Sequence, residues 1–191
     1  MEPILAQRLT EFRLNTMQIG WFFAIWPIFY IPASILVQYM PNSIEKRVTI
    51  ICSTLMSAVA FAFVGPSEMF GFPDSLLLMI IGQALLGIFT ATLMIPGLPE
   101  MVESTLPYFP GQERRVNDIS SGIFNAFLGF GQVLAPMYGS SVKDAVGFRL
   151  TSDIVVIICL VFGLTYFFCG GGVEAFKLSY ANICRERKEG D

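Results

Sequence analysis

Five uncharged stretches, separated by short charged segments, dominate the hydrophobic pattern of this chain. They cover residues Met17–Ile44, Val48–Ser67, Ser75–Pro99, Ile119–Val142 and Ile154–Val173, and each is at least 20 residues long. A helix needs about 20 predominantly apolar residues to cross the hydrocarbon core of a bilayer. The pattern therefore predicts an all-α integral membrane protein with five complete transmembrane helices. A soluble protein of 191 residues could hardly bury five such helices in its core.

The residues before and after these stretches predict two shorter elements. Residues Glu2–Thr16 show a helical stripe but are too short and too charged to span a membrane, so we interpret them as the end of a sixth membrane helix. Near the C-terminus, Phe176, Tyr180 and Ile183 recur at i, i+4 and i+7, as in a short interfacial helix. We therefore divide the chain into 1–16, a helix end and loop; 17–173, the five-span bundle; and 174–191, a juxtamembrane helix and charged tail.

Composition supports the membrane prediction and excludes several kinds of function. The chain is 54% hydrophobic and 14% charged, against about 25% charged residues in soluble domains. Its net charge of −3 and lack of a basic patch argue against a nucleic-acid partner. With no His and four Cys that lack CxxC spacing, we expect no metal site and no cofactor. No catalytic constellation is present, so we do not expect an enzyme.

The third stretch, Ser75–Pro99, contains Pro96, Gly97 and Pro99 near its end, and we expect its last turn to be unwound. After it, Glu100 and Glu103 lie close to the predicted membrane interface. They are either solvated or paired with Arg114 or Arg115.

Orientation follows from the Lys and Arg residues in the short loops, which are enriched on the cytoplasmic side. One set of loops, comprising the 41–47 turn, the 100–117 loop and the C-terminal tail, holds eight Lys and Arg, whereas the opposite set holds four. We expect a multi-pass protein with a cytoplasmic C-terminus. The sequence does not identify the membrane.

The stretch Gly122–Ser140 is the most distinctive part of the chain because glycines and one proline interrupt an uncharged helix. Its pattern is Gly122-x8-Gly131-x3-Ala135-Pro136-x2-Gly139-Ser140. Glycines cost roughly 1 kcal/mol each in a soluble helix, whereas in a bilayer they let two helices approach closely. We expect Gly122, Gly131, Ala135, Pro136 and Gly139 to form a helix-packing motif.

This pattern resembles the glycine-proline signature of antiporters in the major facilitator superfamily, G-x8-G-x3-G-P-x2-G-G. Two positions depart from the signature, Ala135 and Ser140, and both are small residues in place of glycine. Generic packing of small residues is the alternative explanation. In that superfamily each half of the transporter has six spans, a basic turn follows the second span, and the glycine-proline span is the fifth.

The order of elements resembles one half of such a transporter. The basic turn Glu45–Arg47 follows the first complete span, and the glycine-proline pattern lies on the fourth. Two motifs usual in the N-terminal half are degenerate here, with Ser34 and Gln38 in one and Gln83 in place of an Arg in the other. The resemblance therefore implies the C-terminal half. The Glu2-Pro3 pair is similar to an element of the vesicular amine and polyamine branch of drug:proton antiporters.

Candidate substrate-binding residues are polar groups within spans, because such groups are costly in a bilayer. They are Gln83, Asn125 and Gln132, with Glu2 as the carboxylate that the resemblance would place near the membrane centre. Asn125 and Gln132 are seven residues apart and share one helix face. Their amides either bind a polar or cationic solute or hold neighbouring helices together, and Glu2 is alternatively a solvated residue.

These observations and the resemblance predict transport of a small solute by alternating access, coupled to an ion, within a secondary transporter. The expected partners are the lipid bilayer and a second six-helix half, supplied by the same gene, another chain or a homodimer mate. The alternative is a non-transporting membrane scaffold subunit, or a truncated relic of a transporter.

Overall fold

The computed structural model describes residues 2–40, 44–67 and 71–189, and the regular elements in these ranges are all helical. In chain order they are α1 (Glu2–Glu11), α2 (Thr16–Gln38), α3 (Lys46–Val64), α4 (Leu76–Thr105), the 3-10 helix η1 (Leu106–Tyr108), α5 (Glu113–Val146), α6 (Phe148–Cys169) and α7 (Gly172–Glu189). The expected all-α architecture is confirmed. The Pro41–Ser43 turn lies outside the described residues.

Four helical segments are long and apolar enough to cross a membrane: Thr16–Gln38, Lys46–Val64, Leu76–Tyr108 and Phe148–Cys169. These overlap with four of the five predicted spans, although the predicted bounds differ by up to six residues for α2 and α6 and by more at the end of α4. The predicted span over Ile119–Val142 is not confirmed, although α5 runs continuously through it. Asn125, Gln132 and the glycines of α5 lower its hydropathy.

Helix α4 is the centre of the bundle and packs on both α2 and α3. Its buried positions follow helical spacing, and they include Met79, Gly82, Gln83, Leu86, Gly87 and Ala91. A Cβ added at Gly82 would lie 2.6 Å from the backbone nitrogen of Val64, and one at Gly87 would lie 2.4 Å from the carbonyl oxygen of Trp26. Glycine at these two positions therefore lets the neighbouring backbones approach closely.

The end of α4 differs from the prediction. We expected the last turn before Pro99 to be unwound, but the helix continues through Pro96 and Pro99 to Thr105. The expectation was wrong because membrane helices tolerate proline where neighbouring helices and side chains satisfy the freed backbone groups.

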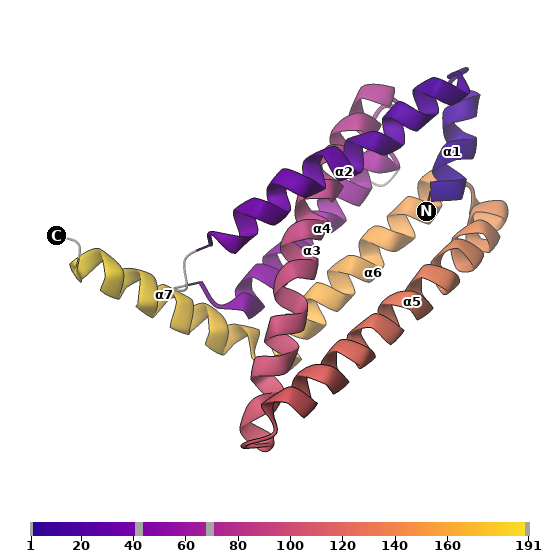
Figure 1. Ribbon diagram of the computed structural model, residues 1–191. Helices are drawn as coiled ribbons and strands as arrows, with labels where there is room; N and C mark the ends of the chain where they lie inside the picture. The colour runs from indigo at the N-terminus through magenta and orange to yellow at the C-terminus, as the bar shows by residue number, and fades with distance from the viewer. Residues whose placement is uncertain (1, 41–43, 68–70, 190–191) are drawn as a thin grey trace.

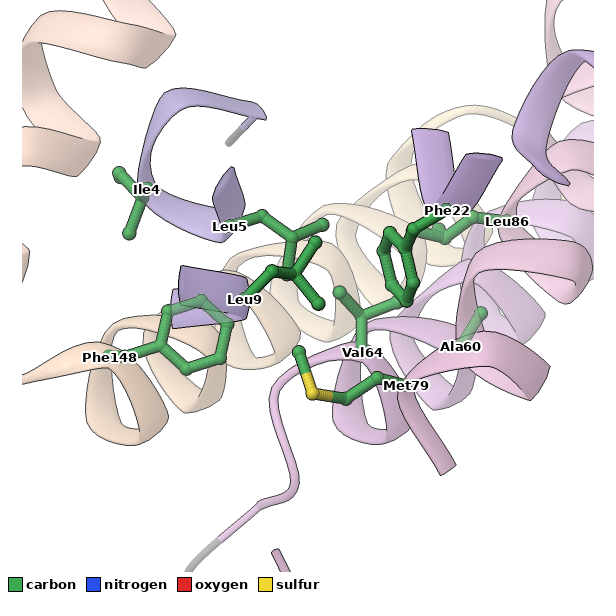
Figure 2. Packing of buried hydrophobic residues seen from close by; sticks show 9 residues of the cluster. All are labelled: Ile4, Leu5, Leu9, Phe22, Ala60, Val64, Met79, Leu86 and Phe148. Atoms are coloured by element: carbon green, nitrogen blue, oxygen red, sulfur yellow. The ribbon is translucent and has the colours of Figure 1, made fainter. Parts of the chain in front are cut away.

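Helix α1 is part of the bundle. Ile4, Leu5 and Leu9 are 4% exposed or less and pack in one hydrophobic cluster with residues of α2, α3, α4 and α6. Figure 2 shows the cluster, whose further members are Phe22, Ala60, Val64, Met79, Leu86 and Phe148. The short helix thus closes one end of the space between the longer helices.

Two helices lie at the periphery (Figure 1). Helix α5 runs along one side and meets α4 near its beginning and α1 and α6 near its end. Among its described residues only Val116 and Ser120 are buried. Helix α7 follows α6 at the end of the bundle that lies opposite α1. It turns away from α6 and runs across that end of the bundle.

Candidate functional site

The exposed side of α5 carries two of the predicted solute-binding residues. Asn125 and Gln132 are both exposed, and their separation of seven residues places them within about 20° of each other around the helix. The Asn125 side-chain amide donates a hydrogen bond of 2.9 Å to the carbonyl oxygen of Ser121, within α5 itself. The structure therefore presents a pair of amides along one outward face.

The glycines of the same helix are also open. A Cβ added at Gly122, Gly129 or Gly131 would meet no other atom of the described chain within 4 Å. Gly139 differs, because an added Cβ there would lie 2.9 Å from Cδ1 of Ile4 in α1. Close approaches at glycine thus occur at α4 and at other positions such as Gly65 and Gly172, whereas most of the α5 motif, including Ala135 and half-buried Pro136, has an open side.

The other two predicted site residues lie elsewhere. Gln83 is only 7% exposed on the packed face of α4 and does not join Asn125 and Gln132 on the outer face of α5. Glu2 is the first residue of α1, and its side chain lies outside the part of the chain whose side chains are described. The four predicted residues therefore do not form one pocket within this chain.

A cluster of ion pairs joins α3 to α4 at the α7 end of the bundle. Arg47 Nε donates to Glu100 Oε1, and Lys46 Nζ donates to Glu103 Oε1. The side chain of Glu100 is 12% exposed, whereas that of Glu103 is 60% exposed. The Arg47–Glu100 pair is therefore the one that is shielded from solvent.

The same cluster reaches the junction between α6 and α7. An Arg47 guanidinium nitrogen lies 3.5 Å from the carbonyl oxygen of Gly170, and the backbone N–H of Glu45 donates a 2.9 Å hydrogen bond to Ser179 Oγ in α7. A cavity of about 570 Å³ lies beside Arg47 and Glu100, and Ser104 and Tyr166 also line it. The turn before α3, the end of α4 and the start of α7 thus meet at one end of the bundle.

These ion pairs correct one of the interpretations of the sequence. The sequence leaves two alternatives for Glu100 and Glu103, which are pairing with Arg114 or Arg115 and full solvation. The structure pairs the carboxylates with Arg47 and Lys46 instead. The feature of the sequence that could have indicated this pairing is the Glu45–Arg47 basic turn. Its charges lie at the start of a membrane span and need partners there.

A second cavity, of about 400 Å³, lies between the end of α4 and the start of α5. Its lining is mostly apolar and includes Met101, Phe109, Val116 and Ile119, with Arg115 among its polar residues. None of the four predicted site residues is among those lining either cavity. Among the described residues, no group of three or more His, Cys, Asp or Glu could hold a metal ion.

Comparison with known protein families gives a match over almost the whole chain. The family described as Major Facilitator Superfamily matches residues 2–179. The match does not distinguish branches of the superfamily, so it does not support the vesicular amine and polyamine branch expected from Glu2-Pro3. Comparison with curated proteins and with solved structures gave no match. Because the family match covers far more than half of the 191 residues, this chain belongs to the Major Facilitator Superfamily.

Proposed function

We propose that this chain is the C-terminal half of a secondary transporter, moves a small solute by alternating access, and couples that movement to an ion. Proteins of the superfamily are typically transporters rather than enzymes. The observation that carries the proposal is the open face of α5, where Asn125 and Gln132 are exposed and Gly122 and Gly131 have no neighbours within the described chain.

The cost of exposing this face to lipid argues for a second half. Amide side chains inside a bilayer turn toward the interior of a helix bundle or toward a water-filled cavity, because hydrocarbon cannot satisfy their hydrogen bonds. In secondary transporters the solute site lies near the middle of the membrane, at the interface between two repeats. A second six-helix half placed against α5 would bury the glycines and enclose the two amides in a cavity.

The chemistry of this face favours a small polar or cationic solute. Asn125 and Gln132 offer both donors and acceptors, and neither carries a charge. Glu2, at the start of α1, would contribute the carboxylate for a cation or a coupled proton if it also borders the assembled cavity. The bundle comprising residues 17–173 would then move as a unit, with the end bearing α7 on the cytoplasmic side as the Lys and Arg distribution predicts.

Transport by Asn125→Leu and Gln132→Leu variants tests the proposal. The assembled native protein would be reconstituted in proteoliposomes and assayed with a panel of monoamines, polyamines and neutral polar solutes. We expect each variant to lose at least about tenfold in uptake with unchanged insertion and thermal stability. Val133→Leu is the matched control, because Val133 is 62% exposed, apolar and adjacent to Gln132.

Uptake that survives both amide substitutions would overturn the proposed role of the α5 face. If the native protein moved none of the solutes and the variants kept their normal partners, the alternative of a non-transporting membrane scaffold would be favoured.

A further inference from the structure

Helix α7 has one face that is fixed to the bundle. Gly172, Ala175 and Ser179 are buried, and they follow each other at intervals of three and four residues. A Cβ added at Gly172 would lie 2.7 Å from Cδ1 of Ile51 in α3. Together with the 2.9 Å hydrogen bond from Glu45 N–H to Ser179 Oγ, these contacts hold the first half of α7 against the start of α3.

A neighbouring face of α7 is apolar and open. It consists of Val173, Phe176, Tyr180 and Ile183, whose exposed fractions are 40%, 38%, 72% and 43%. At 3.6 residues per turn these four side chains fall within about a quarter of the helix circumference. We call this set the α7 stripe. Exposed Lys177 borders the stripe beside Val173, whereas exposed Glu174 and Arg185 lie on the other side of the helix.

The α7 stripe faces the same region as the end of membrane-spanning α6. The ring of Phe176 lies edge-on to that of Phe167 in α6, with 5.7 Å between the ring centroids. Only Gly170 and Gly171 separate α6 from α7, and α7 runs across the end of the bundle (Figure 1). The stripe therefore lies level with the last turn of α6, a helix long and apolar enough to span a membrane.

The charge of α7 differs in sign from that of the whole chain. Within its bounds are four basic residues, Lys177, Arg185, Arg187 and Lys188, and three acidic residues, Glu174, Glu186 and Glu189, so the helix carries one net positive charge. The whole chain carries a net charge of −3. A basic helix with an apolar stripe is attracted to anionic lipid headgroups while its apolar side chains enter the boundary with the acyl chains.

We propose that α7 is a lipid-binding helix that lies in the headgroup region of an anionic membrane leaflet, with the α7 stripe inserted and the net positive charge of the helix attracted to lipid phosphates. The occupant of the stripe is the bilayer that already surrounds α6. This inference does not depend on whether the chain transports a solute. Since Ser179 holds the turn before α3, lipid binding by α7 also fixes the position of the ion-pair cluster.

Site-directed spin labelling of the full-length chain in nanodiscs tests this proposal. In a background where the four Cys are replaced by Ser, a nitroxide is attached at Tyr180→Cys, on the stripe, or at Ala181→Cys, on the other side. Collision rates with oxygen and with a water-soluble nickel complex report depth. We expect the label at 180 to favour oxygen and the label at 181 to favour nickel, with a larger difference in nanodiscs containing phosphatidylglycerol than in phosphatidylcholine alone.

A charge variant tests the lipid chemistry. We expect Lys177→Gln with Arg185→Gln to abolish the effect of phosphatidylglycerol, while the control Arg114→Gln with Arg115→Gln, outside α7, keeps it. Equal access of nickel to positions 180 and 181 would overturn the proposal. So would shielding of position 180 from both reagents, which would indicate a protein contact instead of lipid.

Discussion

Arg47 and Glu100 connect the first turn of α3 to α4 across 53 positions of the sequence. The pair is the more shielded of two ion pairs at this end, since Lys46–Glu103 is more exposed on both sides. Arg47 also reaches toward the carbonyl oxygen of Gly170, so one side chain links α3, α4 and the end of α6. These contacts of Arg47 hold the helices together at this end of the bundle.

Replacing Glu100 by Gln tests that role. The change keeps the size of the side chain but leaves Arg47 without a charged partner. Hydrogen bonds to charged groups contribute about 1.5–3 kcal/mol, and we expect the unfolding midpoint in mild detergent to fall by several degrees. The matched control is Glu103→Gln. Because exposed ion pairs contribute little, we expect this variant to lose at most about 1 kcal/mol of folding stability. Equal losses in the two variants would contradict the account.

The glycines of α4 and α5 are expected to respond differently to alanine. Gly87→Ala places a methyl group 2.4 Å from the carbonyl oxygen of Trp26, and such overpacking typically costs about 1–3 kcal/mol. Gly131→Ala meets nothing in the described chain and gains helix propensity. Thermal unfolding of the isolated chain should therefore show a loss for Gly87→Ala and none for Gly131→Ala. A loss of stability in Gly131→Ala alone would invalidate this comparison.

Arg149 is expected to hold the segment between α3 and α4 in place. Its guanidinium donates hydrogen bonds of 2.7 Å and 2.9 Å to the carbonyl oxygens of Pro66 and Phe72. Arg149→Ala should increase hydrogen exchange at the Phe72 amide, and Arg149→Lys should restore little protection because one ammonium replaces a planar fork of donors. Arg114→Ala, which removes an exposed charge in the first turn of α5, is the control. Full protection in Arg149→Ala would contradict this role.

The core cluster predicts that α1 contributes to stability. Leu9 is completely buried, so Leu9→Ala leaves a cavity within the hydrophobic cluster formed by α1, α2, α3, α4 and α6. Leu→Ala changes in packed cores cost about 2–5 kcal/mol. We expect a clearly lower unfolding midpoint for Leu9→Ala than for Leu77→Ala, since Leu77 is 67% exposed. Indistinguishable midpoints would show that α1 does not stabilise the bundle.

Most of the fold was predictable because long apolar segments have few alternatives in a bilayer. The bounds of α2, α3 and α6 follow from the uncharged stretches to within six residues. The continuation of α4 through Pro96 and Pro99 did not follow, because helix breaking by proline depends on what the neighbouring helices supply. The same applies to α5. Its glycine-proline pattern is compatible with close packing but does not identify the helix against which α5 packs.

Less of the candidate site could be predicted from the sequence. The shared face of Asn125 and Gln132 follows from spacing alone, and both residues are exposed in the structure. The pairing of Arg47 with Glu100 depends on how α3 and α4 are arranged, which no local pattern encodes. Burial of Gln83 likewise results from the close approach that Gly82 and Gly87 allow on either side of it.

The central claim is that the open face of α5 is covered by a second half in the native protein. The most direct test is the mass of the native complex. The complex would be extracted in mild detergent, captured by its C-terminal tail and measured by native mass spectrometry. We predict a particle of about twice the 21.2 kDa of this chain, containing a second set of six membrane helices. A lone 21.2 kDa chain, or one incorporated into a large assembly without such a half, would contradict the claim.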